Sequence, residues 1–166
     1  YATSSNGRWT PPTPGNQTMN YFAYGSNLST SYIREYCPGA KFVTRAQLPN
    51  FQIEFRRYST DLQGGISTIM EAPGKLVHGV LFDIPEAELR ELDVLEDVPL
   101  GLYRRETFLV LSDGMEWQAA DLYRVVTPSG PYEPSSRYID MMIEGATEHG
   151  LDPEYIATLT LLRTNR

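Results

Sequence analysis

The chain is organised around the stretch YFAYGSNL at residues 21–28. Aromatic and small residues alternate through Tyr24, which is typical of a half-buried strand. A Gly-Ser-Asn corner at residues 25–27 then breaks the alternation, and a Ser-Thr-Ser sequence begins a predicted helix. Such a connection leaves several backbone N–H groups without partners inside the helix, at the positive end of its dipole. The stretch therefore predicts either a small anion site built from backbone or a plain connection capped by Asn27 or Ser29.

The composition is that of a globular domain with an acidic surface. The 166 residues suffice for one domain with a sizeable core. Fourteen Lys and Arg oppose 21 Asp and Glu, giving a net charge of −7, and no basic run occurs. Nucleic acids and anionic membranes are therefore not expected as partners. The apolar runs are too short to span a bilayer, and no signal peptide is visible, so we expect no membrane segment.

The inventory of metal ligands and nucleophiles is poor. One Cys and two His in the whole chain make an internal disulfide impossible and a structural zinc site an unfavourable reading. Cys37 precedes a Pro-Gly pair at a predicted helix end, with neither His78 nor His149 near it in sequence. A packed thiol is favoured over a nucleophile there. The sequence thus predicts no structural zinc site, and a reducing, cytoplasmic location.

The remaining pattern predicts an α+β fold. Residues 1–18 are rich in Thr, Ser, Asn, Pro and Gly and predict an extended N-terminal arm, whereas residues 19–166 predict a single domain. Strands are expected at residues 20–24, 41–48, 51–57, 66–70, 75–84, 102–111 and 115–126, with turns at 49–50, 72–74 and 113–114. Helices are expected at 29–36, 85–95, 135–148 and 152–163. Because strands do not alternate strictly with helices, we predict a mostly antiparallel small β-barrel with peripheral helices.

An acidic cluster lies where a helix dipole disfavours it. Asp93, Glu96 and Asp97 follow each other at the C-terminal end of the helix expected over residues 85–95. The dipole, the neighbouring like charges and partial burial between Leu95 and Val98 would all raise a carboxyl pKa. Glu96 is therefore a candidate general base and acid, although these residues also fit a group of surface acids in a loop. His78 and His149 are predicted to be structural.

Ordered motifs beyond the first stretch identify a resemblance. These are GGISTI at 64–69, VHGVLF at 77–82, LDVLED at 92–97, LYRR at 102–105, PSSRY at 134–138 and GATEHGLDPEY at 145–155. Together with YFAYGSNL, over about residues 19–162, they resemble the γ-glutamylcyclotransferase (AIG2-like) family. The resemblance implies a small β-barrel and an enzyme without a cofactor. It implies that the α-amine of a γ-glutamyl amide attacks its own γ-carbonyl, which releases 5-oxoproline and an amine.

The family's site residues map onto this chain by motif. Glu96 is implied as the general base and acid. Substrate binding is implied for the segment from Tyr24 to Leu28 and for three further tyrosines, so that the implied binding residues are Tyr24, Gly25, Ser26, Asn27, Leu28, Tyr103, Tyr123 and Tyr138. For each tyrosine alone, core packing is an equally good reading. Relatives often have Gly after the glutamate, where this chain has Asp97, which bears on substrate choice.

Three matters stay open at this level. The expected partner is a small γ-glutamyl substrate, and its leaving group could be an amino acid, an amine, glutathione or a biosynthetic intermediate. The protein could act as a monomer or a homodimer. A binding module that keeps the pocket without turnover is the alternative function, although an acid facing an anionic ligand argues against it.

Overall fold

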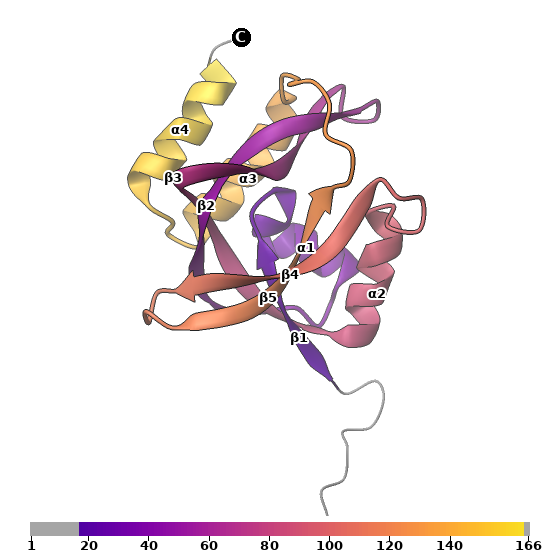
Figure 1. The fold of residues 1–166 in the computed structure, drawn as a ribbon, viewed down its shortest axis with the longest axis vertical. Helices are drawn as coiled ribbons and strands as arrows, with labels where there is room; N and C mark the ends of the chain where they lie inside the picture. Colours follow the sequence, from indigo (N-terminus) through magenta and orange to yellow (C-terminus); the bar gives the residue numbers. More distant parts are fainter. Residues whose placement is uncertain (1–16, 165–166) are drawn as a thin grey trace, which may run out of the picture.

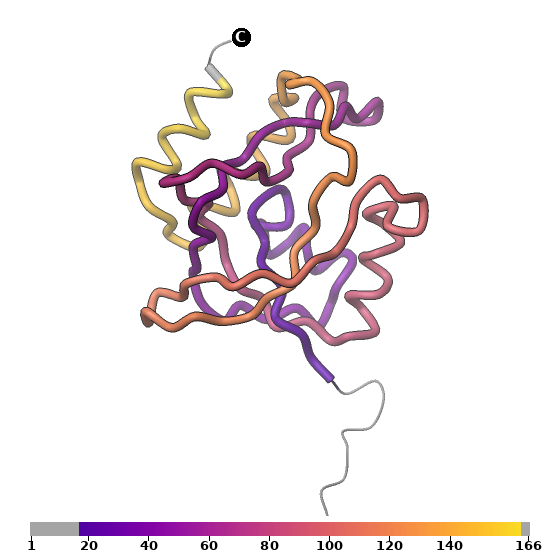
Figure 2. The backbone as a smooth tube through the Cα atoms, in the orientation of Figure 1, coloured from indigo at the N-terminus to yellow at the C-terminus, as the bar shows by residue number. Residues whose placement is uncertain are grey.

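A computed structural model describes residues 17–164 (Figures 1 and 2). The arm predicted for residues 1–18 lies outside this range except for its last two residues. Within the range the elements, in chain order, are β1 (Thr18–Ala23), the 3-10 turn η1 (Ser26–Leu28), α1 (Thr30–Tyr36), β2 (Lys41–Ser59), β3 (Gly64–Pro85), α2 (Glu86–Leu95), β4 (Tyr103–Ser112), β5 (Trp117–Val125), α3 (Ser136–Glu148) and α4 (Pro153–Thr164).

The described strands close into a barrel in the order β1-β3-β2-β4-β5. Neighbouring strands are antiparallel, except that β1 meets β5 in parallel at Tyr21 and Asp121. Closure pairs both edges of the strands within the barrel, whereas among the strands the halves of β2 and β3 beyond residues 50 and 74 pair with each other alone. The predicted α+β class and the small barrel with peripheral helices are thereby confirmed.

Two long strands, β2 and β3, replace the four short strands that the sequence predicted at 41–48, 51–57, 66–70 and 75–84. Residues 49–50 and 72–74 do not reverse the chain, and β2 and β3 instead form one hairpin that bends midway (Figure 2). Asn50 has a φ of +66° and Gly74 a φ of +81°. The Asn50 side-chain oxygen accepts a hydrogen bond from the Gly74 N–H at 3.0 Å, so the two bends face each other across the hairpin. The turn residues mark a bulge here, which re-aims both strands together.

Alternate residues of the strands fill two apolar layers. One cluster includes Phe22, Leu81 and Leu122 and lies inside the barrel. The other includes Phe82 and, from the helices, residues such as Ile139, and it joins the outside of the barrel to its helices. Both faces of the sheet are therefore buried over much of its area, and the cores hold the rim of the barrel in place.

The helices begin at the caps that the sequence provides. Ser29 accepts a hydrogen bond from the Tyr32 N–H at 3.4 Å, and Ser135 accepts one from Tyr138 at 3.2 Å. Both caps satisfy backbone donors that the first helical turn leaves free. Helices α3 and α4 pack side by side, whereas α2 lies on the other side of the molecule in Figure 1. None of the described helices is long and apolar enough to cross a membrane.

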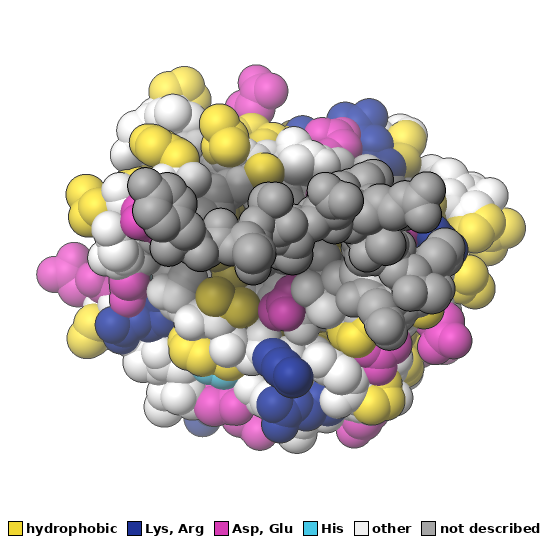
Figure 3. Space-filling model, turned by 90° about the horizontal axis from the view of Figure 1, so that it is seen from below, with side chains coloured by type: hydrophobic (Ala, Val, Ile, Leu, Met, Phe, Trp, Pro, Cys, Tyr) yellow, Lys and Arg dark blue, Asp and Glu magenta, His cyan; other side chains and the backbone are white. Residues whose placement is uncertain are grey.

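One face of the molecule is drawn as a surface in Figure 3. On its described part, acidic, basic and apolar side chains are interspersed rather than sorted into a single basic field. The sequence expectation about nucleic acids and anionic membranes stays a prediction, as does the oligomeric state.

Candidate active site

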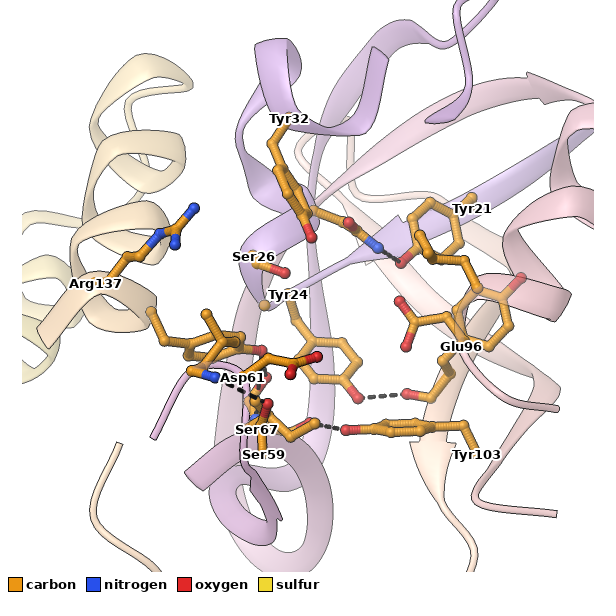
Figure 4. Close-up of a pocket in the computed structure, with 17 residues that line it drawn as sticks. Tyr21, Tyr24, Ser26, Tyr32, Ser59, Asp61, Ser67, Glu96, Tyr103 and Arg137 are labelled. Atoms are coloured by element: carbon orange, nitrogen blue, oxygen red, sulfur yellow. Dashed lines mark hydrogen bonds between the residues drawn. The ribbon is translucent and has the colours of Figure 1, made fainter. Parts of the chain in front are cut away.

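A pocket of about 420 Å³ opens at one end of the barrel (Figure 4). Almost every element of the chain contributes to its wall, so the site depends on the whole fold. The lining residues are Tyr21, Tyr24, Gly25, Ser26, Asn27, Tyr32, Ser59, Asp61, Leu62, Ile66, Ser67, Leu95, Glu96, Tyr103, Tyr123, Arg137 and Tyr138. All predicted site residues are among them except Leu28.

The Gly-Ser-Asn corner forms the 3-10 turn η1 rather than an open loop. The Leu28 N–H donates to the Gly25 carbonyl at 3.1 Å, and the Ser29 N–H donates to the Ser26 carbonyl at 3.3 Å. Leu28 is fully buried in the core. Leu28 was predicted to bind substrate, but it is not among the lining residues of this pocket, because the turn uses its N–H and the core buries its side chain. Gly25, Ser26 and Asn27 line the pocket, and the Ser26 backbone N–H donates a hydrogen bond to the Tyr138 hydroxyl.

Helix α3 supports this turn from behind. A Cβ on Gly145 would lie 2.5 Å from the Leu28 carbonyl carbon and from the Ser29 nitrogen, so the two backbones touch there. The His149 Nε2 lies 2.9 Å from the Leu28 carbonyl oxygen and 3.2 Å from the Thr30 hydroxyl. His149 was predicted to be structural, and these contacts connect it to the end of η1 and the start of α1. These residues position the corner without lining the pocket.

Six of the seventeen lining residues are tyrosines, and five of the six are buried. Tyr24 donates a hydrogen bond to the backbone carbonyl of Tyr123. The Tyr138 hydroxyl lies 2.7 Å from the Ser67 Oγ, and Tyr103 donates to the Ser67 carbonyl at 3.5 Å. Burial raises the pKa of each of these phenols, so they stay neutral at physiological pH. The Tyr123 hydroxyl is hydrogen-bonded to α2, at 2.6 Å to Asp93 Oδ1 and at 3.3 Å to the Leu89 carbonyl.

Glu96 is the C-cap of α2, and its carboxylate projects into the pocket between Tyr21 and Tyr24 (Figure 4). Burial raises the pKa of Glu96 to about 7, while a hydrogen bond from Asn27 and the charge of Arg57 act in the opposite direction. Asp97 raises it further as a smaller contribution. The predicted upward shift is present, but its main cause is burial rather than the crowding of acids.

Two of the three clustered acids, Asp93 and Asp97, form ion pairs with different arginines. Asp93 accepts a hydrogen bond from the Tyr123 hydroxyl at 2.6 Å and pairs with Arg105 at 2.8 Å, so it ties α2 to the barrel. Asp97 pairs with Arg57 at 3.5 Å. Among the described residues no ion pair engages Glu96, and of the three acids it is the one that lines the cavity.

Several lining residues were not predicted from the sequence. Tyr21 lies in the quoted stretch, but strand alternation places it on the face opposite Tyr24. Both reach the pocket because the strand ends at Ala23 and the alternation stops. Asp61 and Arg137 lie on the side of the cavity away from Glu96 (Figure 4). No local signal marks these two, because the approach of the β2–β3 turn to the start of α3 is a tertiary effect.

The arrangement can hold an anionic group at a backbone corner and move a proton at a carboxyl titrating near neutrality. Neutral hydroxyls and aromatic rings separate the two, which keeps the local dielectric low and electrostatic interactions strong. Among residues 17–164 no cluster of three or more His, Cys, Asp or Glu side chains could hold a metal ion. The fold and site thus have the features of a small acid–base enzyme.

Comparisons with known proteins identify the family to which this chain belongs. A model of the AIG2-like family matches residues 76–159. The gamma-glutamylcyclotransferase of Homo sapiens is 34% identical over 157 residues, which cover 92% of this chain and 82% of the relative. That of Bos taurus is 35% identical over 154 residues, covering 90% of this chain and 81% of the relative. The chain therefore belongs to the AIG2-like family of γ-glutamylcyclotransferases.

A solved structure described as a gamma-glutamyl cyclotransferase gives the same result in three dimensions. It superposes with a TM-score of 0.83 at 32% identity, covering 87% of each chain. The family resemblance inferred from the ordered motifs is thereby confirmed.

Proposed function

We propose that this protein is a γ-glutamylcyclotransferase that converts a γ-glutamyl amide into 5-oxoproline and a free amine, with Glu96 as base and acid. One observation carries the proposal: a carboxyl with a pKa raised to about 7 faces a tyrosine-walled pocket beside the Gly-Ser-Asn corner. Membership of the family supports the same activity, because the curated relatives bear that name.

The reaction needs a base but no protein nucleophile. The ionised Glu96 removes a proton from the substrate's α-ammonium, and the free amine attacks the γ-carbonyl carbon of the same molecule. A new C–N bond closes the five-membered ring, and the electron pair of the carbonyl moves to its oxygen. When the carbonyl re-forms, the old amide C–N bond breaks and Glu96 returns its proton to the departing nitrogen. The ring nitrogen gives up its second proton, so that 5-oxoproline keeps one N–H and the released amine takes up that proton as an ammonium. A pKa near the working pH suits both transfers.

The pocket contributes mainly by holding the substrate folded. Intramolecular attack is fast only when the amine and the carbonyl carbon are held near contact distance. The backbone N–H groups of Gly25, Ser26 and Asn27 are suited to bind either the α-carboxylate of the substrate or the oxyanion that develops on its γ-carbonyl. A γ-glutamyl analogue without the α-carboxylate separates them: loss of binding assigns the corner to the carboxylate, and loss of turnover alone assigns it to the oxyanion.

The leaving group extends toward the side of the pocket away from Glu96. Asp61 and Arg137 are the charged side chains that line this side. Opposite charges at one mouth favour a leaving group that carries both an ammonium or amide and a carboxylate, and they favour an uncharged amine less. A panel of γ-glutamyl amides with neutral, anionic and cationic leaving groups measures this preference directly as kcat/KM.

The decisive experiment compares the wild-type protein with Glu96→Gln. We expect release of 5-oxoproline from at least one γ-glutamyl amide, and a loss of kcat of about 100-fold or more in the variant. Thermal unfolding checks that the variant is folded, and Glu91→Gln, on the exposed side of α2, is the matched control. Near-wild-type kcat in Glu96→Gln would contradict the proposed role. Substrate-induced stabilisation of the wild type without any 5-oxoproline would instead indicate a binding module.

A further inference from the structure

We propose that Arg57 and Asp97 are positioning residues, whose ion pair holds the Arg57 guanidinium against Tyr103 and away from the Glu96 carboxylate. The inference rests on the proposed role of Glu96 as the base. It explains why an arginine can stand next to a catalytic carboxylate without capturing it.

Arg57 contacts Asp97 and the Tyr103 ring, and its charge also acts on Glu96, the residue before Asp97. Its Nη2 lies 3.5 Å from the Asp97 Oδ2, and its guanidinium carbon lies 5.3 Å from the centre of the Tyr103 ring. The ring is itself part of the pocket wall, next to the cavity that Glu96 enters. Among residues 17–164 Arg57 forms an ion pair with Asp97 and with no other acid, although Glu96 directly precedes Asp97 in the sequence.

Asp97 has a backbone conformation that favours glycine, so we infer that its side chain is needed at this position. Asp97 has a φ of +54°, in the left-handed region where a residue other than Gly costs roughly 1 kcal/mol. Its carbonyl accepts hydrogen bonds from the N–H groups of Leu100 and Leu102, both at 3.2 Å, so the turn fixes this conformation. Glycine would fill the turn at less cost. The carboxylate, which glycine lacks, is what pairs with Arg57.

The electrostatics around Glu96 agree with a compensated pair. Arg57 lowers the pKa of Glu96 and Asp97 raises it, so the two charges oppose each other at the same carboxyl. The other titratable groups that act on Glu96 are the phenols of the wall, which burial keeps neutral: Tyr21, Tyr24, Tyr32, Tyr103 and Tyr138. Asp61 and Arg137 line the far side of the pocket. Asn27 adds a hydrogen bond that is independent of charge.

Two single variants and their combination test the pair by the direction of their effects. In Asp97→Asn, Arg57 is released and pairs with Glu96, so the acidic limb of kcat/KM moves to lower pH. In Arg57→Gln, Asp97 is unopposed and the limb moves to higher pH. We expect each shift to be roughly half a pH unit to one, because both side chains are partly exposed. The double variant returns close to the wild-type profile.

A spectroscopic titration makes the test independent of turnover. With ¹³C-labelled Glu carboxyl groups, the Glu96 resonance is assigned by its absence in Glu96→Gln, and its midpoint is followed by NMR. The midpoints are expected to move in the same opposite directions. Arg90→Gln removes an exposed i,i+4 ion pair with Glu86 on α2 and is the matched charge control.

The outcomes separate this inference from the proposed function. Opposite shifts that cancel in the double variant support the pair, whether or not 5-oxoproline forms. Shifts of the same sign, or none beyond those of Arg90→Gln, overturn it, even when the wild type is an active cyclotransferase. Failure of the wild type to form 5-oxoproline overturns the proposed function alone, because the NMR midpoints still decide the effect of the pair.

Discussion

The contact between α3 and the corner predicts an unusual effect for Gly145→Ala. In a helix interior this substitution ordinarily stabilises by about 1 kcal/mol, because Ala has the higher helix propensity. Here the new methyl group would lie 2.5 Å from backbone atoms of Leu28 and Ser29, which cannot rotate away as a side chain can. Overpacking of this kind costs roughly 1–3 kcal/mol or more. The clash therefore outweighs the propensity.

We expect Gly145→Ala to lose about 1–2 kcal/mol of unfolding free energy, which lowers Tm by about 2–8 °C in a protein of this size. Urea unfolding measures the loss, and KM for a γ-glutamyl amide is expected to rise because the corner is displaced. Gly114→Ala is the control, since its Cβ would meet nothing nearer than the Ser112 hydroxyl at 3.7 Å. A Gly145→Ala protein as stable as the wild type, with unchanged KM, would refute the reasoning.

Two further predictions concern the buried polar groups of the pocket. Glu96 binds a proton more tightly in the folded state, with a pKa of about 7 against 4.5 unfolded, so its contribution to stability falls as pH rises between these values. The unfolding free energy of Glu96→Gln, measured with urea, should therefore rise relative to that of the wild type by up to about 3 kcal/mol from pH 4 to pH 8. A difference between the two proteins that does not change with pH would contradict this. Tyr138→Phe leaves the buried Ser67 N–H, now 3.3 Å from the phenol oxygen, without that partner. A loss of about 1–2 kcal/mol is expected, and a double-mutant cycle with Ser67→Ala checks whether the two side chains act as a pair.

Features set by neighbouring residues were predictable from the sequence. The serine caps of α1 and α3 follow from residue type and position, and the barrel follows from strands that do not alternate with helices. The candidate base was also found locally, because Glu96 lies at a helix end between apolar neighbours. Its environment was only partly foreseen, since burial depends on Tyr21, Tyr24 and other residues far away in sequence.

Features set by distant residues were not predictable. Pro49 and Asn50 carry the composition of a turn, yet the hydrogen bond from Gly74 to Asn50 makes them a bend in a continuous strand. The same limitation explains Leu28, whose N–H and side chain are taken by the turn and the core. Gly145 and His149 support the corner from more than 115 residues away, and a single sequence has no signal that joins them.

The long hairpin of β2 and β3 divides the protein into parts with different tolerance to change. Its inner half, on the barrel side of the bend, pairs with β1 and β4, whereas the strands beyond the bend pair with each other and carry Ser59, Asp61 and Ser67 to the pocket. Thr68 on this half still accepts a hydrogen bond from the Val125 N–H of β5, so we expect only the turn residues 60–63 to be exchangeable without disturbing the register that closes the barrel. Glu96, the proposed base, is attached to a different support, the C-terminal end of α2. Grafting a tip from another family member is thus a route to new leaving-group preferences on an unchanged proton-transfer apparatus.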